Sequence, residues 1–179
     1  MAHGPVHVTA PPAGAAGLEA AALRHVFGQY PTGVAIVAAA DAHGQVVAMT
    51  INSFTTVSLD PPLVAWCIGA RALDRDAFCN AGHLGISLLS SAQQAQARRF
   101  ADPVLRRAAD SAALFDLDGG TPRLTDAVGW LACTVERRLP LGDHVMLVCR
   151  VTRLAVQPGE ALAYHRSRYT RVDGTRAWT

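Results

Sequence analysis

Six small hydrogen-bonding side chains crowd into nine positions of one otherwise apolar stretch. The stretch is MTINSFTTVSLDPP, residues 49–62. Hydroxyl and amide groups in this number, with neighbouring backbone N–H groups, can hold a heteroaromatic ring edge and a phosphate without a lysine or a Walker loop. The alternative is structural, because threonine favours strands while serine and asparagine favour the turn that follows. The polar side chains are Thr50, Asn52, Ser53, Thr55, Thr56 and Ser58.

Other motifs of catalysis and cofactor binding are missing from the sequence. No GxGxxG follows a strand-like run and no GxxxxGK[ST] occurs, so neither a Rossmann site nor a P-loop is indicated. GxSxG and HExxH are absent as well. The four cysteines, Cys67, Cys79, Cys133 and Cys149, form no CxxC pair and lack partners at zinc-ligand spacing. We therefore predict reduced, mostly buried thiols and no metal site.

The charge and hydropathy of the chain argue against two classes of partner. Hydrophobic residues make up 50 % of the 179 residues and charged residues 17 %, with a formal net charge of +2. The basic residues are all arginines and are scattered, whereas a nucleic-acid surface needs clustered cations. The longest apolar runs are far shorter than a membrane span. We expect neither a nucleic acid nor a membrane as partner.

The length and the two ends of the chain suggest a simple organisation. Residues 1–17 are rich in proline, glycine and alanine and lack the cationic start and compact apolar region of a secretory signal. We predict a mobile tail over 1–17, one domain over 18–172 and a C-terminal tail over 173–179. The expected location is the cytoplasm.

Apolar periodicity predicts a mainly β domain with a few helices. Helical patterns cover 18–28, 73–82 and 90–103, the last with a serine cap. Residues 104–127 read as a loop, with a possible helix around 104–110. Because strands joined by short turns dominate and regular βα alternation is absent, a closed or nearly closed antiparallel barrel is favoured. The strand-like runs are 33–40, 46–54, 63–69, 84–90, 128–139 and 144–156.

Three local expectations follow from the same patterns. Asp41–Gly44 has the composition of a hairpin turn. Leu131, Cys133 and Val135 alternate with outward positions, which predicts a strand buried on one face only. The aromatic side chains Trp66, Trp130 and Phe54 are expected in the core.

Five motifs, in this order, carry a resemblance to a known family. They are YPTGVAIV, MTINSFTTVSLDPPLVAWCIG, GISLLSSAQQAQARRFAD, GTPRL and WLACTVERRLPLGDHVML. Over roughly residues 20–170 the chain resembles the short-chain flavin reductases, the flavin reductase-like family of FMN-binding split barrels. This family includes the reductase components of two-component monooxygenases.

The resemblance implies a fold and an activity. The fold would be a homodimeric antiparallel split β-barrel that binds FMN or FAD near the subunit interface. The activity would be that of an NAD(P)H:flavin oxidoreductase, which takes a hydride from NADH or NADPH and supplies reduced flavin to a partner monooxygenase. Hydride transfer needs stacked rings and a protected gap but no side-chain nucleophile, which fits a sequence that offers none.

The resemblance also implies which residues bind the flavin. One group is a turn that lies against the ring, and a second is the polar stretch, which meets the isoalloxazine edge and continues toward the ribityl chain and phosphate. A third is a helix end that closes over the flavin tail. These positions are Pro31, Thr32, Gly33, Thr50, Ile51, Asn52, Ser53, Thr55, Val57, Ser58, Arg98, Arg99, Phe100 and Ala101.

Two further segments match positions near the nicotinamide. His144, in Gly142-Asp143-His144, matches the catalytic histidine beside this ring. The late segment contributes Tyr164, Arg166, Ser167 and Tyr169. Structural alternatives exist for these residues: His144 could hydrogen-bond Asp143 in a turn, and the tyrosines could pack in a dimer. Arg98 and Arg99 could likewise form the solvated face of a helix.

Three positions depart from the family pattern. Arg71 is followed by Ala72-Leu73-Asp74 where many relatives carry Ser-x-Thr, so hydroxyls that could help hold a phosphate are missing. Cys149 stands where the family commonly has glycine, and Ser167 replaces the glycine of the late Tyr-x-x-Gly-x-Tyr segment. The sequence does not choose FMN over FAD or NADH over NADPH. A flavin-binding or sensing module without turnover, or an oxidoreductase of another small molecule, are the rival functions.

Overall fold

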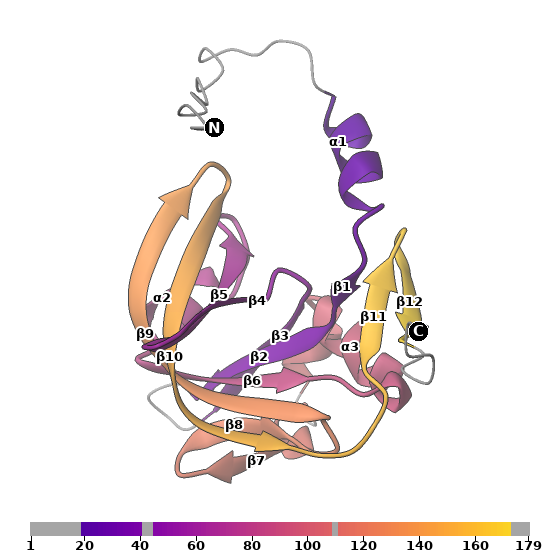
Figure 1. Cartoon of the computed structure of the whole chain (residues 1–179). Helices are drawn as coiled ribbons and strands as arrows, with labels where there is room; N and C mark the ends of the chain where they lie inside the picture. The colour runs from indigo at the N-terminus through magenta and orange to yellow at the C-terminus, as the bar shows by residue number, and fades with distance from the viewer. Residues whose placement is uncertain (1–18, 41–44, 109–110, 173–179) are drawn as a thin grey trace, which may run out of the picture.

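A bent seven-stranded antiparallel sheet dominates the computed structural model of the chain (Figure 1). The structure describes residues 19–40, 45–108 and 111–172. The hairpin predicted at 41–44 and the two predicted tails over 1–17 and 173–179 lie outside the described residues. In spatial order the strands of the large sheet are β3 (Val46–Ile51), β2 (Ala35–Ala40), β6 (His83–Leu88), β9 (Gly129–Leu141), β10 (His144–Val156), β5 (Pro62–Gly69) and β4 (Thr55–Leu59).

Two small sheets and a few short helices complete the described chain. As predicted, strands predominate and the helices are few. In the part of the chain that the structure describes, no helix is long and apolar enough to cross a membrane. The small sheets are β1 (Thr32–Gly33) with β11 (Leu162–His165) and β12 (Arg168–Arg171), and β7 (Phe115–Asp118) with β8 (Thr121–Leu124). The α-helices are α1 (Ala20–Phe27), α2 (Arg75–Asn80) and α3 (Gln94–Ala101), and the 3-10 helices are η1 (Ser91–Gln93), η2 (Leu105–Arg107) and η3 (Ala112–Leu114).

The two faces of the sheet bury two separate hydrophobic clusters. One cluster fills the inside of the bent sheet around Trp66 and Phe78, whose ring centroids lie 5.4 Å apart at 83°. The other lies between the sheet and α3, where Phe100 contacts Phe115 edge to face at 5.4 Å. Edge-to-face pairs of this kind stabilise a core beyond the area they bury. Strand β3 therefore contacts both clusters with alternate side chains, and its outer edge stays unpaired within the described sheet.

Residues 104–127 are more ordered than the sequence pattern predicted. The expected loop contains η2, η3 and the β7–β8 hairpin, and the expected helix at 104–110 is a single 3-10 turn. The hairpin packs on the outer face of the sheet, where Trp130 Nε1 donates a hydrogen bond to Pro122 O at 3.0 Å. A Cβ at Gly85 would lie 1.8 Å from the same carbonyl oxygen, so only glycine fits there.

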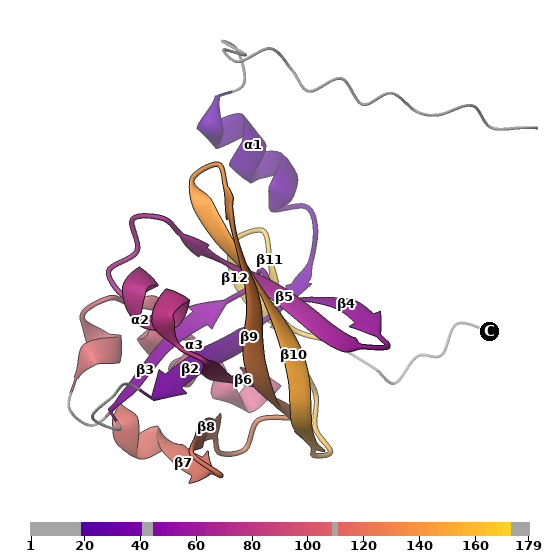
Figure 2. The same cartoon turned by 90° about the vertical axis from the view of Figure 1, so that its left-hand side faces the viewer.

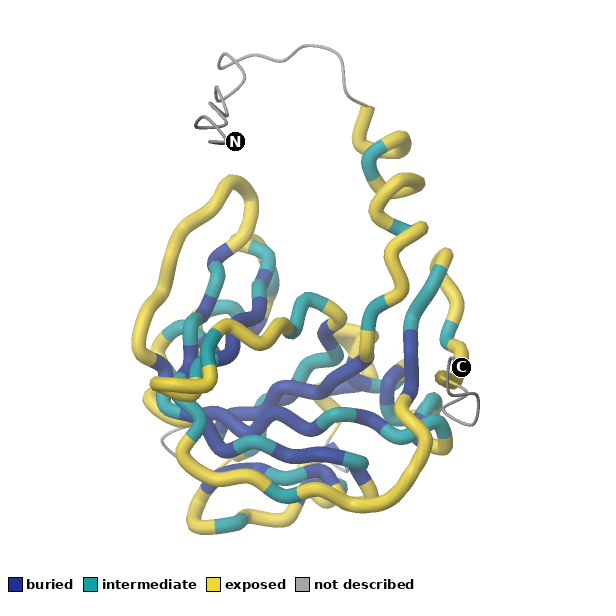
Figure 3. The backbone as a smooth tube through the Cα atoms, in the orientation of Figure 1, coloured by how far each residue is buried: buried dark blue, intermediate teal, exposed yellow. Residues whose placement is uncertain are grey.

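This hairpin also corrects the prediction of a one-sided strand at Leu131, Cys133 and Val135. In the first half of β9 the residues of the other face, Trp130 and Ala132, are buried as well. The second half, from Glu136 onward, is exposed on both faces and forms an arm with the start of β10 (Figures 2 and 3). The prediction of a strand buried on one face only is therefore wrong for both halves of β9: the first half is buried on both faces and the second half on neither.

The three predicted helices are present, but they differ in how they pack. The 90–103 helix is capped as expected, with the Ser90 N–H donating to Gln93 Oε1 at 3.0 Å. Helix α1 buries none of its residues against the described chain, and Val26 and Phe27 are 65 % and 68 % exposed. Figure 3 shows this helix projecting from the domain.

Candidate functional site

The polar stretch forms the end of β3, a turn and the start of β4, and two of its side chains have structural roles. Thr50 Oγ1 donates to the carbonyl oxygen of Ala97 in α3 at 2.8 Å, which fastens the helix to the edge strand. Ser53 Oγ accepts from the Cys67 N–H at 3.0 Å and lies 3.2 Å from the Cys67 carbonyl oxygen. The structural interpretation therefore holds for these two hydroxyls. Asn52, between them, is exposed.

A cavity of about 190 Å³ opens beside the end of β3. Its walls come from β3, the end of α3, and the β11–β12 hairpin, which are far apart in sequence. This volume is below the range of small-molecule sites, so it can enclose part of a ring system rather than a whole cofactor. The lining residues are Val34, Thr50, Ile51, Asn52, Ala101, Tyr164 and Tyr169.

Two tyrosines form one wall of this cavity, and an arginine lies against one of them. The rings of Tyr164 and Tyr169 meet edge to face, with centroids 5.3 Å apart. The guanidinium of Arg98 lies over the ring of Tyr169, 5.7 Å from its centroid, in a cation–π contact. Burial and the neighbouring Tyr164 raise the pKa of Tyr169, so its phenol stays protonated at neutral pH and can donate a hydrogen bond. Arg98, although exposed, therefore helps position this wall.

The predicted turn at Pro31–Gly33 lies next to the same cavity. Thr32 pairs with Tyr164 through β1 and β11. Its hydroxyl oxygen is buried and has no hydrogen-bond partner within the part of the chain that the structure describes. Buried hydroxyls without a partner are costly, so a ligand that offers a polar atom here would satisfy it. Gly33 and Phe54 line a further, mostly apolar cavity of about 250 Å³, and Val34 lines both cavities.

Several predicted residues are not at this cavity. Phe100 is buried in the core, and Arg99 donates to Ser111 Oγ at 3.0 Å. Thr55, Val57 and Ser58 lie on β4, the opposite edge strand of the large sheet, and do not line the cavity.

The late segment turns through Arg166 and Ser167, which both have positive φ, 48° and 61°. Glycine adopts this backbone conformation without steric cost, so Ser167 is strained where the family has glycine. Arg166 anchors the turn to the end of α1: its N–H donates to Gly28 O at 3.0 Å and its Nε to Gln29 Oε1 at 2.8 Å. Neither turn residue lines the 190 Å³ cavity.

His144 stands at the tip of the β9–β10 arm. Its Nδ1 lies 2.7 Å from Asp143 Oδ1, as the turn interpretation predicted, and its side chain is 50 % exposed. The hydrogen bond to His144 lowers the pKa of Asp143. With Nδ1 engaged, Nε2 is the ring nitrogen left for another partner. In Figure 1 the arm and the β11–β12 hairpin rise on opposite sides of the sheet, so one chain does not bring His144 to the tyrosine wall.

The cysteines are free, as predicted. Burial raises the pKa of Cys133 to about 12 and that of Cys149 to about 11, so both remain protonated thiols. Burial also raises the pKa of Cys67. Among the residues that the structure describes, no three His, Cys, Asp or Glu side chains gather in a way that could hold a metal ion.

Comparison with known proteins gives one consistent family. The sequence model of the flavin reductase like domain matches residues 27–173. A probable flavin reductase of Rhizobium meliloti is 37 % identical over 83 % of this chain, although the chain spans only 47 % of that protein's length. An NADH:FMN oxidoreductase of Rhodococcus erythropolis is 34 % identical over 92 % of this chain and 88 % of its own length.

The solved structures agree with the sequence relatives. BorF, the flavin reductase component of a bacterial two-component tryptophan halogenase, superimposes with a TM-score of 0.80 and 30 % identity, over 86 % of this chain and 98 % of BorF. This likeness confirms the predicted antiparallel split-barrel fold.

Proposed function

Because the chain belongs to the flavin reductase like domain family, we propose that it is an NAD(P)H:flavin oxidoreductase that reduces FMN or FAD by hydride transfer. One observation carries the proposal within the structure. Three segments that are far apart in sequence, around Asn52, Ala101 and Tyr164, meet at one partly enclosed cavity. The family resemblance places flavin contacts in the first two of these segments and nicotinamide contacts in the third.

The residues of this cavity fit the edge of a flavin ring. The Thr32 hydroxyl and the Asn52 amide would pair with the polar ring edge, and the Tyr164–Tyr169 wall would exclude water from one side. The bound flavin supplies the hydride-accepting chemistry itself. The protein's contribution is therefore orientation and protection of the ring.

We also propose a homodimer, in which a second protomer brings its arm toward the cavity. The support is the separation of His144 from the tyrosine wall within one chain, together with apolar side chains left exposed on α1 and on the arm, such as Phe27 and Leu141. In a two-fold symmetric dimer both subunits use the same surface, so a single interface would bring one arm to each of the two cavities. A monomer mass by light scattering at micromolar concentration, with flavin present, would contradict this.

The physiological partner proposed is a flavin-dependent monooxygenase or related oxygenating enzyme in the cytoplasm. BorF, which this chain resembles, serves a tryptophan halogenase. The four free thiols are consistent with a reducing compartment.

A turnover assay tests the proposed function. NADH and NADPH are each combined with FMN, FAD and riboflavin, and the loss of reduced nicotinamide absorbance is followed. We expect rapid turnover with at least one pair. Flavin binding without turnover would instead identify a binding or sensing module, and turnover only with an added non-flavin acceptor would identify a different oxidoreductase.

His144→Ala tests the proposed nicotinamide contact. If Nε2 positions the carboxamide, the variant raises the KM for NAD(P)H and slows flavin reduction by roughly 10- to 100-fold, with flavin affinity nearly unchanged. Stopped-flow reduction at saturating flavin and varied NADH measures this step. Asp143→Asn is the matched control, because it weakens the turn hydrogen bond and keeps the imidazole. An alanine variant with the rate and nucleotide dependence of the parent would remove His144 from the site.

A further inference from the structure

The cavity of about 250 Å³, called the apolar cavity below, lies where the start of β2, the end of β6 and strands β1 and β11 come together. None of the nine described residues that line it carries a polar side-chain atom, and all of them lie well inside the described ranges. Its wall consists of the buried Val34, Ala35, Leu89 and Leu162, the half-buried Phe54, Leu88 and Val128, and the exposed Gly33 and Ala161.

Three backbone segments around the apolar cavity are hydrogen-bonded to one another. The Val34 N–H donates to Leu162 O at 3.2 Å, the Leu89 N–H to Val34 O at 3.0 Å and the Leu162 N–H to Leu89 O at 2.9 Å. Each of these residues therefore uses its donor and its acceptor within one closed ring of hydrogen bonds. A buried water molecule needs about two to four polar partners, and here it would meet groups that are already paired. The cavity is therefore better suited to an apolar ligand than to water.

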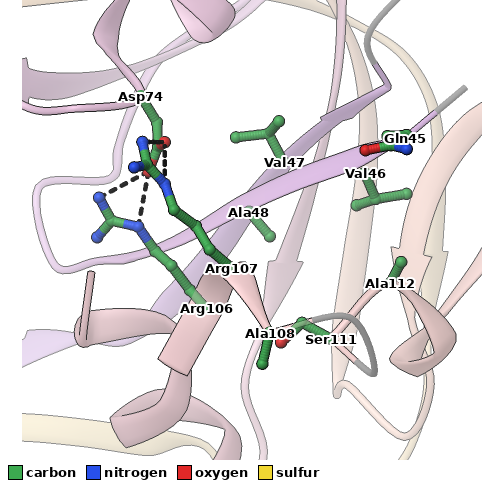
Figure 4. A pocket seen from close by; sticks show the side chains of 10 residues that line it. All are labelled: Gln45, Val46, Val47, Ala48, Asp74, Arg106, Arg107, Ala108, Ser111 and Ala112. Atoms are coloured by element: carbon green, nitrogen blue, oxygen red, sulfur yellow. Dashed lines mark hydrogen bonds and ion pairs between the residues drawn. The ribbon is translucent and has the colours of Figure 1, made fainter. Parts of the chain in front are cut away.

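A larger cavity, of about 630 Å³, lies beside the first residues of β3, Gln45 to Ala48, and has the opposite chemistry (Figure 4). At one end Arg106 Nε and Nη2 each lie 2.7 Å from Asp74 Oδ2, and Arg107 Nε donates to Asp74 Oδ1 at 3.1 Å. The side chains of Asp74 and Arg106 are 7 % and 6 % exposed, whereas that of Arg107 is 50 % exposed. An uncharged ligand there would take water away from ionised groups without pairing with them. Of these two cavities, only the apolar one suits a ligand without charge.

The volume and the walls of the apolar cavity fit a molecule of one or two aromatic rings. A dry apolar cavity of about 150 Å³ binds benzene, so a volume of about 250 Å³ leaves room for a second ring. The ring of Phe54 offers an aromatic surface, and aromatic pairs gain free energy beyond the area that they bury. A charged ligand would lose its hydration and find no partner in these walls.

Small residues at the surface leave the apolar cavity accessible to such a molecule. Gly33 and Ala161 are the two exposed residues of its wall. A Cβ at Gly33 would meet no other atom of the described chain within 4 Å, so the opening is not filled by a neighbouring side chain.

The apolar cavity is a neighbour of the smaller cavity of about 190 Å³ beside Thr50–Asn52. Val34 lines both cavities, and on strand β11 Tyr164 lines the smaller one while Leu162 lines the apolar one. An aromatic molecule in the apolar cavity and a flavin ring in the smaller cavity would therefore both contact Val34, each from its own cavity.

We propose that the apolar cavity binds one small uncharged aromatic molecule of one or two rings, together with the flavin and not in its place. This inference goes beyond the proposed function, because the ligand is neither the flavin nor the hydride donor. Binding is measured without turnover, so the failure of this inference and the failure of the proposed function are distinguishable.

The test uses indole as the probe, titrated into the isotope-labelled full chain with and without a saturating flavin and followed by two-dimensional NMR. We expect saturable binding of one molecule per chain, with shift changes at the amides of Val34, Leu89 and Leu162 in both cases. Indole-3-acetate is the matched control ligand, because it adds a carboxylate to the same rings, and it should bind about tenfold more weakly or less.

Two variants fill the apolar cavity from different walls. Val128→Phe and Ala161→Phe should each weaken indole binding by about tenfold or more, because the added ring takes up the volume of the ligand. Ala95→Phe, on the exposed face of α3, adds the same ring elsewhere and should change the affinity by less than about threefold. Thermal melts verify the fold of each variant, and the shift changes in the parent protein test the site independently of them.

Four other outcomes would each overturn the inference. Displacement of indole by the flavin would make the apolar cavity a part of the flavin site. Shift changes confined to other residues, or equal binding of indole-3-acetate, would place the probe elsewhere. Folded Phe variants that bind indole as the parent does would have the same meaning. The absence of saturable binding, even if flavin is reduced rapidly, would contradict the inference alone, whereas indole binding by a chain that reduces no flavin would contradict only the proposed function.

Discussion

The two ends of β3 differ in the kind of polar chemistry that they present. At the Thr50–Asn52 end the polar groups are neutral, and two of the neighbouring hydroxyls are used to fasten the fold. At the Val46–Ala48 end the polar groups are ionised, and two of the three charged side chains are almost fully buried. Neutral hydrogen bonds discriminate by geometry, whereas buried charge requires a partner of opposite sign. The polar groups at one end of the strand therefore depend on hydrogen-bond geometry, and those at the other end depend on charge pairing.

The largest effect expected concerns the charged end. Asp74→Ala leaves the buried Arg106 without its carboxylate, which should lower the free energy of unfolding by about 3–5 kcal/mol. Urea unfolding measures this loss. Asp118→Ala, which breaks the more exposed pair with Arg153, should cost about 0–1 kcal/mol. If both variants lose an equally small free energy of unfolding, the buried ion pair at the charged end does not contribute to stability in the way that its burial indicates.

A smaller effect is expected at the neutral end, and on binding rather than folding. Asn52→Leu removes the exposed amide beside the smaller cavity and should weaken riboflavin binding by about 1–3 kcal/mol, because a polar ring atom is then buried unpaired. Riboflavin is used since it lacks phosphate and reports on the ring alone. The fold should be unaffected because Asn52 is exposed. Unchanged affinity in the folded variant would place Asn52 outside the ring site.

The smallest effect is expected for the Thr50 hydroxyl, whose hydrogen bond to α3 has a structural role at the neutral end of β3. Thr50→Val keeps the side-chain shape and removes the hydrogen bond to Ala97 O, so it should cost about 0.5–1.5 kcal/mol of stability. Thr56→Val, on the exposed strand β4, is the matched control and should be near neutral. Chemical unfolding compares the two. A loss no greater at position 50 than at position 56 would mean that the hydroxyl does not fasten α3 to the strand.

The long strands of the large sheet were predicted because each is an apolar run bounded by turn residues, and α3 was predicted from its serine cap, its alanine and glutamine content and the Asp-Pro that ends it. The short strands β1, β11 and β12 were not predicted. The β7–β8 hairpin was missed because its strands have four residues each and carry aspartates and a proline. A signal was present in Gly119 and Gly120, which both take positive φ in the turn. The buried outer face of Trp130 followed from this hairpin and could not be predicted without it.

For the candidate site, the sequence predicted segments better than side-chain directions. The stretch around Asn52 and the two tyrosines do meet at one cavity, but Phe100 points into the core and Arg166 holds a turn. Direction depends on which neighbour each side chain packs against. Asp74 illustrates the same limit, since its partner Arg106 lies 32 positions away and no local pattern pairs them.

Helix α1 gives a way to observe assembly in solution. Eight residues are too few to stay helical in water without tertiary contacts, and this helix buries none of its side chains against the described chain. Only its C-terminal end is tied down, through the contacts of Arg166 with Gly28 and Gln29. Its amide hydrogens would therefore exchange with deuterated water about as fast as those of a free peptide, until another surface covers Val26 and Phe27. Slow amide exchange in α1 would therefore indicate that another surface covers Val26 and Phe27 in solution.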